Sequence, residues 1–152
     1  MALPNVEKLT NQMQKNIVSA GLINNYTLTS AGEFIVPLDK QMFKLGDKLT
    51  LQNNRIVLGE NINAVKIFAQ INFSNTKSGA MNIAIKKNGT TIAEVLNYNA
   101  NSANNISLYV EAVMEVTESD YIELAGYQYE GTILMSTNGR THITVEAINW
   151  RR

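Results

Sequence analysis

The chain has no cysteine, one histidine and two prolines among its 152 residues. The absence of cysteine excludes disulfides, thiolate metal sites and a cysteine nucleophile. A single histidine excludes a metal site built from several imidazoles, so we expect no metal ion and no cofactor. Since Pro4 and Pro37 are the only prolines, no run typical of a central strand is interrupted.

The chain also lacks an excess of either charge, with 13 basic and 13 acidic residues. Binding to nucleic acid by counterion release needs a basic face, and binding to an anionic membrane needs a basic cluster. No apolar run approaches the roughly 18 residues of a membrane-spanning helix, and the first residues do not follow the pattern of a secretory signal. We therefore expect neither a nucleic-acid nor a membrane partner. Asparagine is abundant instead, at 20 positions.

The first twenty residues have helical periodicity. Their apolar members are three or four positions apart: Val6, Leu9, Met13, Ile17 and Ala20. Asn5 is suited to cap the start and Gly21 to end it, which predicts a helix of about 16 residues and about 24 Å. Such a helix is marginal alone in water. Two hypotheses stay open: the stripe packs on its own domain, or it forms a short coiled-coil seam between chains.

From Tyr26 onward the periodicity is two, which predicts half-buried strands. The clearest run is 64–73, where Val65, Ile67 and Phe73 share one side. Asn-Asn and Asn-Gly pairs separate such runs and tolerate the positive φ angles of tight hairpins. Roughly eight to ten strands at 8–12-residue spacing predict a sandwich, jelly roll or barrel. We divide the chain into an N-terminal helix and linker, 1–25, and a β head domain, 26–152.

Several positions that alternate with the expected core are large and apolar rather than polar. They are Phe68, Tyr109, Val113, Tyr121, Tyr127, Tyr129, Ile148 and Trp150. Contiguous exposed apolar side chains usually mark an interface, so we interpret part of this set as a contact between subunits. The alternative is that some of them pack under loops or under the N-terminal helix.

No arrangement typical of catalysis is found in the sequence. His142 stands beside the Asn138-Gly139 turn, and no Gly-x-Ser-x-Gly motif accompanies it. Asp39, Asp47 and Asp120 occur in or beside turns, which favours turn and cap roles over a glycosidase carboxylate pair. We therefore assign no catalytic residue.

The order of these features resembles the C1q/tumour-necrosis-factor-like jelly roll of phage tail, baseplate and fibre proteins. The resemblance covers roughly residues 30–150 and rests on 49–59, the 65–73 strand, the 87–89 hairpin, 116–124 and 141–148. Val116, Asp120, Tyr121 and Ile122 match a valine, turn and acid-aromatic-isoleucine run that precedes a late core strand in that family. Ser119 stands where the family usually has glycine.

The resemblance implies an all-β antiparallel jelly-roll sandwich that forms homotrimers, here with a short N-terminal α-helix. Some of the large apolar residues that alternate with the core, together with the apolar stripe of the helix, would then lie around the threefold axis. The interface residues expected on this basis are Val6, Leu9, Met13, Ile17, Phe68, Tyr109 and Tyr121.

The expected function is that of a non-enzymatic phage or prophage structural protein, located in the virion and made in the bacterial cytoplasm. As a fibre-tip or baseplate component it would bind a bacterial surface receptor, for which a saccharide suits stacking tyrosines and hydrogen-bonding asparagines. Its helix would contact other virion proteins. The candidate ligand-binding residues are Tyr98, Asn99, Asn101, Tyr127, Tyr129 and Trp150. The alternatives are a capsid decoration or head-fibre protein without a receptor, and a monomeric carbohydrate-binding module.

Overall fold

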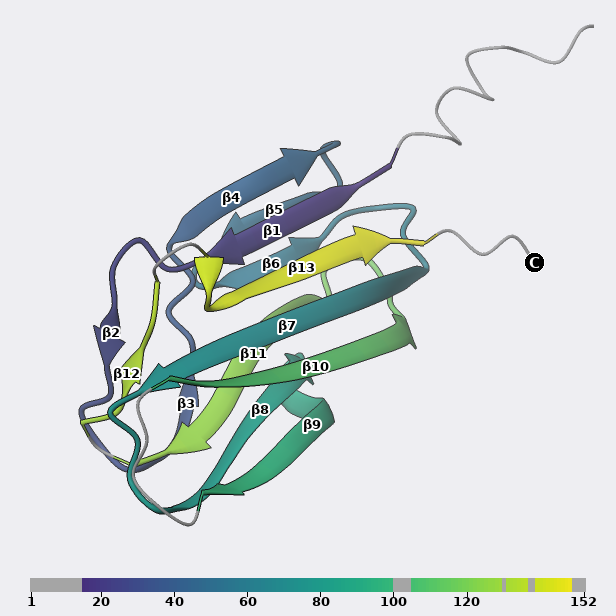
Figure 1. Cartoon of the computed structure of the whole chain (residues 1–152). Coiled ribbons are helices and arrows are strands. Elements are labelled where there is room, and N and C mark those ends of the chain that lie inside the picture. Colours follow the sequence, from purple (N-terminus) through teal and green to yellow (C-terminus); the bar gives the residue numbers. More distant parts are fainter. Residues whose placement is uncertain (1–14, 100–104, 130, 137–138, 149–152) are drawn as a thin grey trace, which may run out of the picture.

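The computed structural model describes residues 15–99, 105–129, 131–136 and 139–148, which form two antiparallel sheets packed face to face (Figure 1). The first sheet has seven strands: β1 (Ile17–Gly21), β2 (Tyr26–Thr27), β4 (Lys40–Leu45), β7 (Ala64–Ser74), β10 (Ile106–Glu115), β12 (Ile133–Leu134) and β13 (His142–Ala147). The second has six: β3 (Gly32–Ile35), β5 (Leu49–Gln52), β6 (Arg55–Leu58), β8 (Gly79–Lys87), β9 (Thr90–Asn99) and β11 (Tyr121–Gln128).

The long strand β7 organises the first sheet. One of its edges pairs with β10 along its whole length, and the other pairs with β13 and then with β12. The order continues from β13 through β1 to β4, which is the last strand on that side. In the second sheet β11 lies between β8 and the collinear strands β3 and β6, while β9 is the last strand. The sandwich thus has β4 at one edge and β9 at the opposite edge (Figure 1).

The core lies between the two sheets, as the alternation predicts. Fully buried side chains of the first sheet include Val18, Ile67, Ile71, Phe73 and Val145, and those of the second include Ile56, Met81, Ile83, Ile122 and Leu124. Phe34 and Phe73 connect the layers in an edge-on contact, with ring centroids 6.4 Å apart. The strand predicted at 64–73 is confirmed as β7.

The asparagine turns adopt the predicted conformations. Asn53 and Asn54 have φ angles of 50° and 63°, and Asn88 and Gly89 have 51° and 79°. Two successive positive φ angles match the right-handed twist of the strands that the turn connects. The turns therefore set the register of the β5–β6 and β8–β9 hairpins.

The predicted N-terminal helix is wrong from Ile17 to Ala20, because these residues belong to β1. Val18 and Ala20 are fully buried between the sheets, and β1 pairs with β13 on one side and β4 on the other. Apolar residues at 17, 18 and 20 are compatible with both the helical and the strand period. Pairing with strands that are distant in sequence decides in favour of the strand. The sandwich therefore begins at Ile17, not at residue 26, and Val6, Leu9 and Met13 lie outside the described residues.

Candidate functional site

Three surfaces of the sandwich carry large apolar or aromatic side chains that lie outside its core. The first is the outer face of the first sheet. Residues that alternate with the core of β7, β10, β13 and β1 point to this side, and the β-sheet register places them in rows. Phe68 lies opposite Glu111 in β10 and opposite Thr144 in β13, and Thr144 in turn lies opposite Ser19. We call this surface the Phe68 face.

Large apolar side chains cover much of the Phe68 face and remain in water in the single chain. Tyr109 is 52% exposed and Val113 is 60% exposed, and the Phe68 ring lies 6.2 Å from that of Tyr109. On the other side of Phe68 the ring of His142 lies 5.7 Å away, and its Nδ1 contacts the carbonyl oxygen of Gly139 at 2.6 Å. The face continues to the edge strand β4, whose exposed apolar residues are Met42, Phe43 and Leu45.

The predicted interface residues separate into three groups. Ile17, Phe68 and Tyr109 all belong to the Phe68 face, where Ile17 lies opposite Leu45. Tyr121 lies in the second sheet, half-buried, with the Arg55 guanidinium 4.2 Å above its ring centroid. The three N-terminal members lie outside the described residues. Met42, Phe43 and Leu45 were not predictable from the sequence, because the run in β4 does not alternate and all six of its residues are exposed.

The second surface is the edge formed by β9. Ile92, Val95 and Leu96 are exposed there, Leu96 to 69%. Val95 lies opposite Ile83 in the ladder and so faces the interior side of the sheet, yet it is still 39% exposed because the sandwich is open at this edge. The β9 edge and the apolar end of the Phe68 face at β4 are therefore two different apolar surfaces on opposite edges of one subunit.

The third surface is the outer face of the second sheet, which holds three of the predicted ligand-binding residues. Tyr127 is exposed, and its ring lies 6.3 Å from that of Tyr129 in an edge-on arrangement. Tyr98, 74% exposed, projects from the neighbouring part of β9. We call this the Tyr127 face. Asn99 is engaged elsewhere, because its Nδ2 donates to Thr76 Oγ1 at 3.1 Å, and Asn101 and Trp150 lie outside the described residues.

A hollow of about 190 Å³ lies on the Tyr127 face. Its lining residues are Glu33, Asn82, Ala84, Thr91, Glu94, Gly126 and Tyr127. The Asn82 amide donates to Glu94 Oε2 at 3.3 Å, and Glu33 forms an ion pair with Lys86. A small floor at Ala84 beside a tyrosine ring and several carboxylate oxygens is suited to a polyhydroxylated ligand, since the ring can stack and the oxygens can accept hydrogen bonds.

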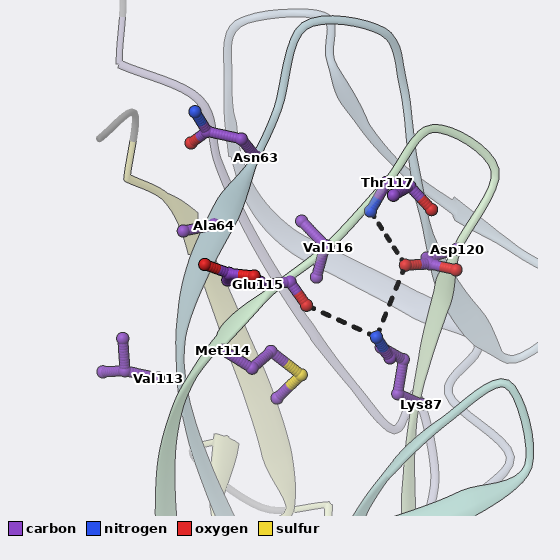
Figure 2. Close-up of a pocket in the computed structure, with 9 residues that line it drawn as sticks. All are labelled: Asn63, Ala64, Lys87, Val113, Met114, Glu115, Val116, Thr117 and Asp120. Carbon is purple, nitrogen blue, oxygen red and sulfur yellow. Dashed lines mark hydrogen bonds and ion pairs between the residues drawn. The ribbon is translucent and has the colours of Figure 1, made fainter. Parts of the chain in front are cut away.

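A larger hollow than this one is a separate pocket of about 790 Å³, which we call the β10 pocket (Figure 2). Its lining residues are Asn63, Ala64, Lys87, Val113, Met114, Glu115, Val116, Thr117 and Asp120. They come from the start of β7, the end of β8 and the end of β10 with the loop that follows. The Met114 side chain extends toward Lys87, whereas Val113 points away (Figure 2). No motif connects these segments in the sequence, so the pocket could not be predicted from the sequence alone.

The polar rim of the β10 pocket is held by its own hydrogen bonds. Asp120 accepts from Asn88 Nδ2 at 2.6 Å and from the Thr117 backbone N–H at 2.9 Å. Lys87 Nζ donates to the Glu115 carbonyl at 3.3 Å and lies 3.7 Å from Asp120 Oδ2. Burial of the Asp120 carboxyl acts to raise its pKa, but these hydrogen bonds and the Lys87 charge outweigh burial and leave the pKa below its ordinary value.

The turn role predicted for Asp120 is confirmed, because its Oδ2 accepts from the Thr117 backbone N–H at 2.9 Å in the loop before β11. Asp39 instead connects two segments that are distant in sequence, since its Oδ1 accepts from the Ile23 backbone N–H, 16 positions away, at 2.7 Å. The described residues contain no group of three or more acidic or histidine side chains placed to hold a metal ion. In the same part of the chain no helix has the length and apolar character needed to cross a membrane.

No family model matches the chain, and no curated protein matches it significantly. Solved structures do match. The crystal structure of murine APRIL at pH 5.0 superposes with a TM-score of 0.71 at 13% sequence identity. The match covers 89% of this chain and 100% of the APRIL chain. The chain has the tumour-necrosis-factor-like jelly-roll fold. A second match, the Eiger TNF of S. frugiperda, has a TM-score of 0.67 at 8% identity and covers 91% of this chain and 94% of its own.

Proposed function

We propose that this jelly roll is a non-enzymatic binding head that assembles into a homotrimer and acts in a phage or prophage particle. In the virion it serves as a fibre-tip or baseplate component that attaches to a bacterial surface receptor, with a saccharide as ligand. The proposal of a homotrimer rests on one observation: two different apolar surfaces, the β9 edge and the β4 side of the Phe68 face, lie on opposite edges of the sandwich. The resemblance at Val116 and 120–122 supports the phage assignment, since that family forms trimeric tips.

Two different surfaces that complement each other favour a head-to-tail contact, which closes into a ring when the rotation allows. In the proposed trimer the β9 edge of each subunit packs on the β4 side of its neighbour's Phe68 face. That contact removes Phe43 and Val95 from water, along with Tyr109 near the threefold axis. The Tyr127 face belongs to the other sheet and stays accessible at the outside.

Light scattering during size-exclusion chromatography tests the trimer. We expect a mass near three times the chain mass of 16.9 kDa. Phe43→Asp and Val95→Asp should each give monomers, because a buried unpaired charge at the contact is strongly unfavourable. Asn24→Asp, on an exposed loop of the same chain, should leave the trimer intact.

Mixing the two variants distinguishes a head-to-tail ring from a symmetric contact. Each variant keeps one intact surface, and the two intact surfaces are different. An equimolar mixture should therefore form a heterodimer and nothing larger. A mixture that stays monomeric contradicts the head-to-tail arrangement, and a monomeric wild type contradicts the trimer and favours a monomeric carbohydrate-binding module.

The receptor assignment is tested by binding to an array of bacterial-type oligosaccharides built from neutral hexoses and N-acetylhexosamines. We expect Tyr127→Ala to abolish binding and Tyr98→Ala to weaken it, since loss of a stacking ring costs about 1–3 kcal/mol by analogy with base stacking on aromatic side chains. Tyr26→Ala is the matched control, because Tyr26 is 39% exposed on a strand of the first sheet. A trimer that binds no glycan or bacterial surface instead favours a capsid decoration or head-fibre protein.

A further inference from the structure

The hollow on the Tyr127 face lies where two neighbouring outward positions of the second sheet carry alanine. Ala84 in β8 alternates with the core row, and its partner across the ladder is Ala125 in β11. Larger side chains stand beside this pair, namely Tyr127 two residues along β11 and Glu94 opposite Ala84 in β9. At about 190 Å³ the hollow is smaller than the roughly 300 Å³ at which sites for drug-sized ligands begin, so it is suited to a single sugar unit.

The rows of side chains that hold the hollow have an excess of negative charge. Three glutamates point to this side, Glu33 in β3, Glu123 in β11 and Glu94 in β9, whereas Lys86 in β8 is the one cation among the described residues of these rows. The Lys86 ammonium group pairs with Glu33. Glu94 has no ion-pair partner in the part of the chain that the structure describes. One carboxylate that lines the hollow therefore has no cation beside it.

Hydrogen bonding leaves the hollow richer in acceptors than in donors. The Asn82 amide nitrogen is already directed to Glu94 Oε2, at 3.3 Å. The Oδ1 atom of the same Asn82 is buried and has no partner among the residues that the structure describes. The hydroxyl groups of Thr91 and Tyr127, which also line the hollow, can either donate or accept. A ligand group that donates several hydrogen bonds and carries a positive charge complements this set.

One sugar ring can contact both sides of the hollow. Tyr127 and Glu94 belong to β11 and β9, and β8 lies between them, so the two strands are two spacings apart, about 10 Å. Both side chains line the hollow from their own side. The aromatic ring of Tyr127 can then pack on the face of the sugar while the Glu94 carboxylate accepts from one of its substituents.

We propose that the hollow selects a hexosamine whose amino group is free and protonated over an N-acetylhexosamine or a neutral hexose. An ammonium group donates three hydrogen bonds and accepts none. An acetamido group is neutral, donates one hydrogen bond and brings a carbonyl oxygen toward the carboxylate of Glu94. This inference rests on the proposed saccharide function and specifies the class of sugar that the Tyr127 face takes.

Calorimetric titration of the full-length protein with three tetrasaccharides tests this selection. The probes are β-1,4-linked tetramers of glucosamine, N-acetylglucosamine and glucose, which differ only in the substituent at C2, and pH 6 keeps the amines protonated. We expect the glucosamine tetramer to bind about tenfold more tightly than the other two, because it adds an ion pair and charge-assisted hydrogen bonds at a partly exposed site. Added salt should weaken the binding of this tetramer alone.

Two substitutions of opposite effect locate the selection in the hollow. Glu94→Gln should remove the preference for glucosamine and leave the binding of the neutral tetramers nearly unchanged, since glutamine keeps the shape and one oxygen acceptor. Lys86→Gln should increase the preference, because it leaves the Glu33 carboxylate without its cation. A gain in affinity cannot result from impaired folding. Glu118→Gln is the matched control, because Glu118 is exposed in the loop before β11, at the opposite end of that strand from Tyr127.

A preference for glucosamine that Glu94→Gln abolishes and Lys86→Gln increases supports the proposal. Equal binding of the three tetramers overturns it and leaves the saccharide function in place. A preference that survives Glu94→Gln, or that Glu118→Gln reduces equally, also overturns it, because the amine then binds elsewhere on the chain. Failure of all three tetramers to bind overturns the inference, and a negative result on the bacterial oligosaccharide array as well would contradict the proposed function itself.

Discussion

The Asp120 carboxylate joins two loops, and its removal should weaken the fold by an amount that depends on pH. Oδ1 accepts from Asn88 in the β8–β9 turn, and Oδ2 accepts from the Thr117 N–H in the loop before β11. The Asn88 side chain extends this hydrogen-bond network to β11, because its Oδ1 accepts from the Tyr121 N–H at 2.9 Å. Asp120→Ala removes the carboxylate from the centre of this network.

The expected cost follows from the number and the exposure of these bonds. Hydrogen bonds to a charged group contribute about 1.5–3 kcal/mol each, and both donors here can turn partly to water, so we expect a loss of about 2–3 kcal/mol at pH 7. For a chain of this size that corresponds to a fall in Tm of roughly 4–12 °C. Asp47→Ala is the control, because Asp47 is an exposed carboxylate in a turn and its removal should change the free energy of unfolding by less than about 0.5 kcal/mol.

The pH dependence has a fixed sign. The folded-state pKa of Asp120 is lowered from its ordinary value of 3.8, so its contribution is fully present above that value. The contribution is lost as the pH falls through the folded-state pKa. Asp120→Ala should therefore differ most from wild type at pH 5–7, and the two curves should converge in stronger acid.

Urea unfolding at one fixed subunit concentration, repeated from pH 2.5 to 7, measures both effects and avoids concentration-dependent shifts of an oligomer. Wild type and Asp120→Ala that differ by less than about 0.5 kcal/mol at pH 7 would refute the network argument. A difference that grows toward acid would refute the assigned direction of the pKa shift.

Three further substitutions test the packing and the turns. Ile67→Ala in the fully buried row of β7 should cost about 2–5 kcal/mol in urea unfolding, whereas Lys66→Ala on the opposite side should cost little. Gly126→Ala places a Cβ 2.7 Å from Cζ of Phe34, so overpacking should cost about 1–3 kcal/mol and lower the Tm. At Gly89→Ala the new Cβ meets only an ordinary contact, 3.9 Å from the Tyr121 hydroxyl, but the φ of 79° is unfavourable, so the backbone alone should cost about 1–2 kcal/mol, with an unchanged circular dichroism spectrum.

The strands were predictable where one face is buried and the other is wet. In β7 apolar and polar residues alternate clearly, which predicts a strand. The Asn88-Gly89 pair predicts the tight turn of the β8–β9 hairpin. The segment 17–21 was not predictable in this way, because its apolar spacing fits a helix and a strand equally. Its conformation is decided by β13, whose pairing residues stand more than a hundred positions later.

The candidate surfaces were predictable only in part. Phe68, Tyr109 and Tyr127 stand out in the sequence because a large ring replaces a polar residue within an alternating strand. Phe43 gives no such signal, since its strand is exposed on both sides at an edge. The β10 pocket has no local signature at all, because it exists only where the ends of β7, β8 and β10 meet.

The position of β13 sets the order in which the molecule can fold during synthesis. This strand, the last one among the residues that the structure describes, lies in the interior of the first sheet, with β1 on one side and β7 on the other. A nascent chain therefore carries β1 and β4 without their attachment to β7 until residue 147 has emerged from the ribosome. At about 5–20 residues per second, the first hundred residues wait for several seconds with an unpaired strand edge. Closure then requires pairing between β1 and β13, which are far apart in sequence, and this makes folding slow compared with a fold of local hairpins.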